Sequence, residues 1–363
     1  MRERVLVAMS GGVDSSVAAA WLVAQGHDVV GVTLHLWDYP DDGSVRGRCC
    51  APEDLFDARR VADRLEIPHY AFDRRELFQR EVVTPFVDAY LGGETPSPCV
   101  SCNRSVKLRE LLALADDLGA SAVATGHYAR VNHDAALPEL LRAKDRSKDQ
   151  SYFLHMLTPA ELSRVRFPLG DSLKAEVRES AVTLGLPGAG KGESQELCFV
   201  PKGRYDQFVA ERAAGRIGSG SIVDEAGSEL GRHEGIHRFT VGQRRHLGIA
   251  LGERTYVVGI DAASKSVTLG PRERLLARGA KLDSVSLMPD VRAPFHAEAV
   301  VRYRGQPVRV SARECDAGGL EVEFESPVQA VVPGQVLVFY AGERVLGGGR
   351  IVQALGAAKS RGT

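Results

Sequence analysis

The sequence of 363 residues contains no apolar stretch long enough to cross a bilayer, which argues against an integral membrane protein. Its first residues, MRERVLV, run directly into an apolar strand, so we expect no signal peptide and a cytoplasmic protein. The formal net charge is only −1, so any nucleic-acid surface must be local. Six cysteines in a cytoplasmic chain of this size favour chemistry or metal binding over structural disulfides.

Two common nucleotide-binding signatures are also missing near the N-terminus. No Gly-Lys-Ser/Thr follows the first glycines, as a Walker loop requires, and there is no GxGxxG. Instead, an apolar strand ends in Ser10-Gly11-Gly12, and Asp14-Ser15-Ser16 opens a helix. Adjacent glycines let the backbone turn tightly, and the N–H groups of the loop and helix start then suit a phosphate or pyrophosphate. The serine hydroxyls add donors, and Asp14 is expected to hold Mg²⁺ or to cap the helix.

Strands and helices alternate through the first half, which predicts an α/β domain built on a parallel sheet with helices on both faces. The expected strands are 5–9, 29–37, 69–73 and 121–128, and the expected helices are 15–25, 52–65, 76–91 with a break near Pro85, and 106–118. Ligands of such sheets bind at the carboxyl ends of the strands. Ser10, Leu34 and Gly126 fall at or near such ends, so we expect them to converge.

After about residue 205 glycines become frequent and the expected strands are short. Strand pairs are expected within 218–235 and 255–270, and the steady alternation from Ala297 onward predicts a small β-barrel or sandwich. We therefore predict a nucleotide-binding catalytic domain at 1–204, a small central domain at 205–275 and a C-terminal β-barrel at 276–363.

One cysteine pair precedes an expected helix. Cys102 follows Cys99 in a CxxC, and Pro96 and Pro98 are expected to keep the segment before it extended. A thiol at a helix N-terminus beside cationic side chains, here Arg104 and Lys107, should have a lowered pKa. The alternatives for Cys102 are a structural thiol or one zinc ligand, although a second CxxC is absent.

The other cysteines carry weaker signals. Cys198 lies in a stretch rich in glycine and is either reactive or an inert, half-buried thiol. Cys49 and Cys50 are adjacent and cannot easily ligate one metal ion, and Cys315 is expected to be a core or edge-strand side chain.

The chain resembles the bacterial tRNA-specific 2-thiouridylases, a family of ATP pyrophosphatases with a phosphate (PP) loop, over nearly its whole length. The motifs that carry the resemblance occur in this order: SGGVDSS, PSPCVSCNRSVK, ATGHYAR, KDQSYFLH, ESQELCF, HRFTVGQRRHLGIA, VRYRG and VVPGQ. The resemblance implies a PP-loop domain, a small central domain and a C-terminal β-barrel. It also implies an enzyme that thiolates the wobble uridine, position 34, of certain tRNAs.

The resemblance implies a reaction in which ATP, with Mg²⁺, adenylates the uridine and releases pyrophosphate. Cys198 would carry a persulfide, Cys102 would be the partner nucleophile, and the two would end as a disulfide that must be reduced. The sulfur would come from an upstream sulfur carrier or a cysteine desulfurase. The implied ATP-binding residues are Ala8, Met9, Ser10, Gly11, Gly12, Val13, Asp14, Ser15, Leu34 and Gly126.

The implied tRNA-binding residues are His127, Lys148, Asp149, Gln150, Arg302, Tyr303, Arg304 and Gln335. Arg302 and Arg304 alternate with Tyr303, so we expect both guanidinium groups on one face of a strand. From the residues alone, a solvated basic strand face is the preferred interpretation.

The chain departs from many relatives at one position, where Cys99 replaces an acidic residue. The family's motifs would place Cys99, Cys102 and Cys198 around one cavity, and three thiolates could hold a [4Fe–4S] cluster with an open iron. Other functions also stay open. Another ATP pyrophosphatase would not need two separated thiols, and a 4-thiouridine synthase would be expected to have an N-terminal RNA-binding region. A non-catalytic nucleotide-binding tRNA chaperone with a metal knuckle is the alternative outside enzymes.

Overall fold

The structure, a computed structural model, describes residues 2–38, 52–188, 197–249, 252, 254–315 and 318–356. Cys49 and Cys50 lie outside the described residues. The chain divides into two compact units. The first unit comprises Met1–Val83, Cys99–Gly203 and Glu343–Val345, and the second unit comprises Thr84–Pro98, Arg204–Gly342 and Leu346–Thr363. None of the helices in the described ranges is long and apolar enough to cross a membrane.

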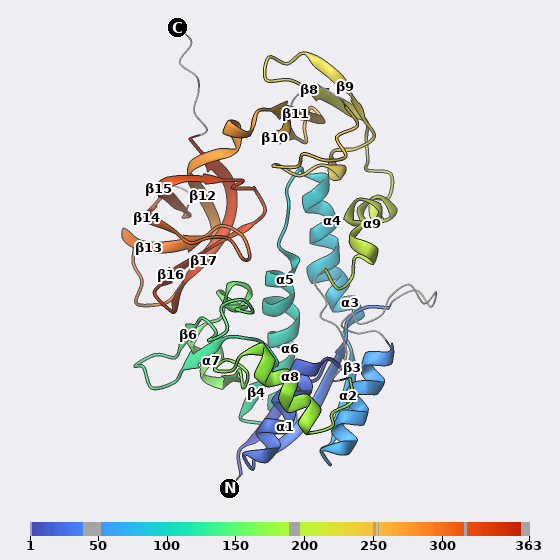
Figure 1. The fold of residues 1–363 in the computed structure, drawn as a ribbon, viewed down its shortest axis with the longest axis vertical. Helices are drawn as coiled ribbons and strands as arrows, with labels where there is room; N and C mark the ends of the chain where they lie inside the picture. Colours follow the sequence, from blue (N-terminus) through green and yellow to red (C-terminus); the bar gives the residue numbers. More distant parts are fainter. Residues whose placement is uncertain are drawn as a thin grey trace. The chain divides into compact units, whose positions relative to one another are not determined.

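The first unit is built on a five-stranded sheet, as the alternation of strands and helices predicts (Figure 1). Its order is β3 (His69–Asp73), β2 (Asp28–His35), β1 (Arg4–Ala8), β4 (Ala122–Ala124) and β7 (Val165–Arg166), and every pair is parallel. The central strand β1 is buried on both faces, which explains its uninterrupted apolar run. The carboxyl ends of β2, β1 and β4 are therefore neighbours, as expected for Leu34, Ser10 and Gly126.

Helices cover both faces of this sheet because successive strand residues point to opposite sides. Val5 and Val7 share a core with α1 (Val13–Ala24), α2 (Pro52–Arg64) and α8 (Lys174–Thr183). The helix α6 (Arg109–Asp117) contacts β1 and β4 outside that core. The expected strand 121–128 is shorter than predicted, because the chain leaves the sheet at Thr125 and Gly126 then lies against the first turn of α1.

Two helical segments contain wide π-helical turns. The first runs through α3 (Arg75–Phe78), the π-helix η1 (Gln79–Val83) and α4 (Thr84–Leu91), so the expected break lies before Pro85 and takes the form of a π-helical turn. The second runs through α5 (Pro98–Ser101), the π-helix η2 (Cys102–Leu108) and α6. The prediction of a helix beginning at 106 is wrong, because Pro98 fits the first helical turn and starts the helix earlier.

The first unit also contains several short elements. They are β5 (Arg130–Asn132), β6 (Glu139–Leu141), the 3₁₀ helix η3 (Ser151–Leu154), α7 (Pro159–Arg164) and the 3₁₀ helix η4 (Pro201–Gly203). Arg344 also belongs to this unit and pairs with Leu141 of β6.

The second unit contains α4, α9 (Tyr205–Arg212) and a four-stranded sheet. Its strands are β8 (Gly220–Val223), β9 (Glu229–His233), β10 (Tyr256–Asp261) and β11 (Ser266–Gly270), in the order β10-β11-β8-β9. The 3₁₀ helices η5 (Ile236–Arg238) and η6 (Arg272–Leu275) complete this region. Aromatic contacts join the two helices: Phe86 packs edge to face on Phe208, and Tyr90 stacks on Tyr205 at 4.7 Å between ring centroids.

The C-terminal part of the second unit is a closed β-barrel. Its strands are β12 (Leu276–Leu287), β13 (Phe295–Val300), β14 (Val308–Glu314), β15 (Leu320–Gln329), β16 (Val336–Ala341) and β17 (Arg344–Leu355). The strand β12 pairs with both β15 and β17, which closes the barrel. The alternation from Ala297 predicts the later strands but not β12. Cys315 follows β14 in a turn, where its N–H donates to the Gly319 carbonyl, and not within a strand as expected.

Gly11 and Gly26 make a matched pair for testing the packing around α1. Both have positive φ, 71° and 85°, but a Cβ at Gly26 would have nothing within 4 Å, whereas one at Gly11 would lie 2.1 Å from the Asp54 carbonyl oxygen. We expect Gly26→Ala to lower the free energy of unfolding by about 1–2 kcal/mol, because of the left-handed backbone alone. Gly11→Ala should lower it by about 2 kcal/mol more, because α2 must shift.

Urea unfolding followed by tryptophan fluorescence measures both effects, because Trp21 and Trp37 are the only tryptophans and both lie in the first unit. Equal destabilisation of the two variants would contradict the tight packing of Gly11 against α2.

Candidate active site

The loop Ser10–Gly12 follows the central strand and leads into α1, and serine hydroxyls of the first turn of α1 hold its shape. Ser10 N–H donates to Ser15 Oγ at 3.1 Å, and the hydroxyls of Ser15 and Ser16 both donate to the Gly12 carbonyl at 3.0 Å. These hydroxyls therefore stabilise the turn, a role that the sequence does not predict. The first N–H groups of α1 have no acceptor within the helix, and with the helix dipole they form a site for an anion.

Asp14, in the first turn of α1, is held by two side chains that the sequence motifs do not indicate. Lys174 Nζ lies 2.6 Å from Asp14 Oδ1 and 2.7 Å from Oδ2, and the Tyr128 hydroxyl donates to Oδ1 at 2.9 Å. Asp14 does not cap the helix, because the N-cap residue is Gly12 and no side chain caps it. Lys174 lies 160 residues from Asp14, so no local pattern in one sequence could pair them.

The other expected ATP-binding residues lie around this loop. Ala8 ends β1, Met9 is buried, and Leu34 is a buried residue of β2. A Cβ at Gly126 would lie 2.7 Å from Ser15 N, so the backbone after β4 passes directly against the first turn of α1. Glycine at 126 therefore permits close packing within the protein, whatever it offers to a nucleotide.

The loop, Lys174 and Asp14 together suit a nucleotide phosphate with its divalent cation. Free N–H groups at the helix start and a lysine ammonium group can face phosphate oxygens, and a carboxylate is a ligand that Mg²⁺ prefers. In the structure the lysine and the carboxylate neutralise each other, and the pair is only partly exposed. A phosphate and a magnesium ion could share these same two partners.

The cysteines of the first unit occupy two elements. Cys99 lies in α5, and Cys102 is buried at the first residue of η2, one turn inside the helix. The expectation that Cys102 sits at a helix N-terminus is therefore wrong, because the helix begins at Pro98. The charges on this helix face neighbouring segments: Arg104 Nη1 lies 3.7 Å from Met156 Sδ, and the charge of Lys107 helps to lower the pKa of His127.

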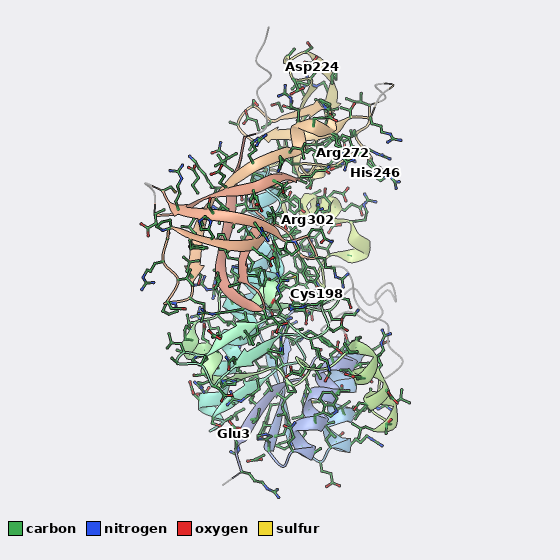
Figure 2. The ribbon with its side chains drawn as sticks, turned by 60° about the vertical axis from the view of Figure 1, so that its left-hand side comes forward. Glu3, Cys198, Asp224, His246, Arg272 and Arg302 are labelled. Atoms are coloured by element: carbon green, nitrogen blue, oxygen red, sulfur yellow. The ribbon has the colours of Figure 1, made fainter. Side chains whose placement is uncertain are left out.

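Cys198, labelled in Figure 2, is fixed by the residue that follows it. The Phe199 ring packs edge to face on Phe78 and on Trp37, with centroids 5.5 and 6.2 Å apart. Trp37 comes two residues after β2, so this aromatic cluster anchors Cys198 to the strand that neighbours β1. Over the ranges that the structure describes, no group of three or more His, Cys, Asp and Glu side chains could hold a metal ion. Cys99, Cys102 and Cys198 lie within those ranges, so the structure does not assemble them as cluster ligands.

The segment expected to contact tRNA is tied into the first unit. Asp149 Oδ1 accepts from the N–H groups of Ala143 and Ser151, both at 3.1 Å, and Oδ2 accepts from the Ser151 hydroxyl. Gln150 Oε1 accepts from Tyr128 N–H at 2.9 Å. Asp149 thus shapes the segment. The backbone N–H of Lys148 donates to the Asp145 carbonyl.

His127 is a neutral histidine in this structure. Its Nδ1 lies 2.8 Å from Thr125 Oγ1, and burial, helped by the charge of Lys107, lowers its pKa to about 3. It can therefore offer hydrogen bonds to a base but no positive charge to a phosphate.

Three expected tRNA-binding residues of the second unit, among them Arg302, which is labelled in Figure 2, lie in a turn after β13. The prediction that Arg302 and Arg304 share a strand face is wrong. Gly305 N–H donates to the Arg302 carbonyl, which closes a turn, and Arg304 has a φ of 59°. The Arg304 guanidinium lies 5.2 Å from the centre of the Tyr303 ring.

Gln335 anchors a neighbouring segment of the second unit. Its Nε2 donates to the Thr95 carbonyl at 2.9 Å, and the Thr95 N–H donates to the Pro333 carbonyl. Beside them, Arg350 bonds both Glu94 and Asp283. The loop 333–335 therefore holds the residues that lead into the cysteine-bearing helix.

A parallel sheet whose central strand leads into a phosphate-binding loop and helix is the arrangement of the PP-loop ATP pyrophosphatases. Three family models match the chain: "tRNA methyl transferase HUP domain" over residues 3–202, "tRNA methyl transferase PRC-barrel domain" over 206–271 and "Aminomethyltransferase beta-barrel domain" over 278–351.

Curated relatives match along almost the full length. A tRNA-specific 2-thiouridylase MnmA from Sorangium cellulosum is 61% identical over 357 residues, which cover 97% of this chain and 93% of the relative. One from Geobacter metallireducens is 48% identical over 361 residues, which cover 98% of each chain. A solved 4-thiouridine synthetase–RNA complex with bound ATP matches with a TM-score of 0.38 and 19% identity, over 59% of this chain and 51% of that chain. The chain belongs to the family of tRNA-specific 2-thiouridylases.

The buried histidines of the first unit predict an acid-sensitive stability. Burial lowers the pKa of His155 to about 4, and its Nδ1 lies 2.9 Å from the Tyr152 carbonyl. The unfolded chain keeps a pKa near 6.5 and binds more protons below it, so stability is lost as the pH falls from about 6.5 toward 4. This one histidine should lower the free energy of unfolding by about 1.5 kcal/mol between pH 6.5 and 5.

Urea unfolding of wild-type protein and His155→Gln at both pH values measures this contribution through Trp21 and Trp37. The fall in stability on acidification should be smaller in His155→Gln by about 1.5 kcal/mol, and unchanged in a control that alters the exposed His296. The same fall in all three proteins would contradict the role of His155.

Proposed function

We propose that this chain is a tRNA-uridine 2-sulfurtransferase that converts the wobble uridine, position 34, into 2-thiouridine and releases AMP and pyrophosphate. The observation that carries the proposal is the combination, in one unit, of a phosphate-binding loop with Cys102 and Cys198. The names of the relatives agree with thiolation. The family model's description mentions methyl transfer, but a phosphate loop and paired thiols serve adenylation and sulfur transfer.

The first step is adenylation of the uridine, which is needed because the O2 oxygen is by itself a poor leaving group. The uridine O2 atom attacks the α-phosphorus of ATP, the bond to pyrophosphate breaks, and the oxygen becomes part of an AMP leaving group. The loop 10–12 and the first N–H groups of α1 stabilise the negative charge that develops on pyrophosphate. Lys174 is placed to add a positive charge there. Mg²⁺, bound with ATP beside Asp14, would neutralise further phosphate charge.

The second step replaces oxygen by sulfur. The terminal sulfur of a Cys198 persulfide attacks C2, and AMP leaves with the oxygen. The Cys102 thiolate then attacks Cys198 Sγ, which breaks the sulfur–sulfur bond and leaves the outer sulfur on the base. The products are 2-thiouridine and a disulfide between Cys102 and Cys198, which an external thiol reductant must reduce. An upstream sulfur carrier or a cysteine desulfurase supplies the next persulfide.

We propose that His127 and Lys148–Gln150 of the first unit contact the anticodon loop, and that Arg302–Arg304 of the second unit contact tRNA phosphates. Single-stranded loops are read by splaying a base out and bonding its edges, which suits a neutral imidazole and an amide. Such an enzyme acts in the cytoplasm, where tRNA is modified.

The sequence-based alternative, free sulfide delivered by a [4Fe–4S] cluster on Cys99, Cys102 and Cys198, is not favoured, because the structure does not bring these residues together as ligands. Anaerobic purification with iron and sulfide analysis separates the two routes. Cluster-free protein that thiolates tRNA from a persulfide donor would exclude the cluster, and protein that is active only with bound iron would exclude the persulfide route.

Cys102→Ser and Cys198→Ser should each abolish the formation of 2-thiouridine, while ATP binding persists because neither thiol belongs to the phosphate loop. Mass analysis of tRNA nucleosides after incubation with ATP and a persulfide donor measures the product. Cys315→Ser, in the barrel, is the matched control and should keep wild-type activity. Near-normal turnover in either active-site variant would overturn the two-thiol mechanism.

Replacing both Arg302 and Arg304 by alanine should weaken tRNA binding and flatten its dependence on salt. For each arginine that neutralises a phosphate, its removal should reduce the slope of log K against log salt concentration by about 0.7–0.9. Alanine at both Arg292 and Arg309, which are also exposed arginines of the second unit, is the control for charge alone. A slope equal to that of wild-type protein would remove the turn after β13 from the tRNA footprint.

A further inference from the structure

The segment 145–150 touches, at its two ends, the two residues that hold Asp14. At one end, Asp145 Oδ2 accepts from the backbone N–H of Lys174 at 3.0 Å, at the start of α8. At the other end, Gln150 Oε1 accepts from Tyr128 N–H at 2.9 Å, and Gln150 N–H donates to the Tyr128 carbonyl at 2.8 Å. The segment is therefore fastened to the backbone of both residues.

The side chains of those same two residues meet on one carboxylate. Lys174 Nζ and the Tyr128 hydroxyl both reach Asp14 Oδ1, at 2.6 and 2.9 Å. The Lys174 ammonium also lies 5.6 Å from the centre of the Tyr128 ring. Tyr128 and Lys174 are both buried, which restricts their side chains to this arrangement. The contacts close a ring that runs from Asp14 through Tyr128 and Gln150, along the chain to Asp145, and back through Lys174.

The side-chain amide of Gln150 uses its oxygen for this ring of contacts. The oxygen accepts from Tyr128, whereas none of the hydrogen bonds between described residues uses its NH₂ group. An amide carries two donors besides its acceptor, so a nucleotide base can bond the NH₂ group without breaking the bond to Tyr128. Gln150 is partly exposed, so a ligand can reach it.

We propose that Tyr128 is a positioning residue that couples tRNA binding at 148–150 to the phosphate loop. The inference rests on the proposed function, because it takes tRNA as the ligand of Gln150. A bound base restrains Gln150, which restrains Tyr128, whose hydroxyl fixes the carboxylate of Asp14 and, with it, the ammonium group of Lys174. The enzyme then binds ATP in a productive geometry mainly when its tRNA is present.

Such coupling must work in both directions. If bound tRNA tightens the binding of ATP by some factor, ATP tightens the binding of tRNA by the same factor. The hydroxyl of Tyr128 makes the hydrogen bond that links Tyr128 to Asp14 on the shorter route from Gln150. The substitution Tyr128→Phe removes this hydroxyl and keeps the aromatic ring beside Lys174. Because a purely structural defect weakens each ligand without regard to the other, the ratio of affinities isolates the coupling.

The test measures the affinity of α,β-methylene-ATP with Mg²⁺, which cannot release pyrophosphate, by calorimetry with and without saturating tRNA. In wild-type protein we expect tRNA to tighten the analogue by about 5-fold or more. In Tyr128→Phe and in Gln150→Ala the factor should fall below about 2-fold, and the double variant should show no further fall, because both residues act along one path. Tyr70→Phe alters an exposed tyrosine of β3 and should keep the wild-type factor.

A wild-type factor of one, or a wild-type factor that survives in Tyr128→Phe, would overturn the coupling. Effects that multiply in the double variant would also overturn it, because Gln150 and Tyr128 would then act independently. Failure of wild-type protein to form 2-thiouridine from a persulfide donor is a separate result and would refute the proposed function itself. Thermal melts of the variants show whether they are folded, and the reverse titration, tRNA with and without the analogue, must return the same factor.

Discussion

The candidate active site depends on close backbone packing around the loop Ser10–Gly12 and the start of α1. Main chain packs against the loop and against the helix turn that follows it. The Asp54 carbonyl of α2 lies where a side chain at Gly11 of the loop would begin, and Gly126 lies against Ser15 in the first turn of α1. Ser15 and Ser16 then turn their hydroxyls inward to the Gly12 carbonyl. A loop held by such backbone contacts is pre-organised, so little ordering remains to be done when an anion binds.

The second determinant is electrostatic. Asp14 and Lys174 form an ion pair that is only partly open to water, and Tyr128 donates to the same carboxylate. Removing either charge would leave the other partly buried and without its partner, which is more damaging than losing an exposed pair. In the proposed function the same two groups separate when the nucleotide binds, with the ammonium group facing a phosphate and the carboxylate facing the cation.

The sequence predicts those parts of the protein that arise from local patterns. The alternation of strands and helices predicts the parallel sheet, and SGGVDSS predicts the loop, because both patterns are local. The motif puts Cys102 at a helix start only if Pro98 holds the chain extended, whereas proline also fits the first turn of a helix. Arg302 and Arg304 alternate as in a strand, but Gly305 closes a turn around them. Lys174 and Tyr128 could not be found locally, because only the folded sheet brings them to Asp14.

The helix α4 has a consequence for the ancestry and handling of this protein. Its residues lie between two stretches of the first unit in the chain, yet Phe86 and Tyr90 are buried against Phe208 and Tyr205 of the second unit. A fragment cut after residue 203 would keep α4 and lose its aromatic partners, which would expose an apolar face and invite aggregation. The nucleotide-binding part is therefore interleaved with its neighbour. Recombination could not transfer the nucleotide-binding part as one contiguous segment of sequence, unless the recipient protein supplied new apolar residues to pack against α4.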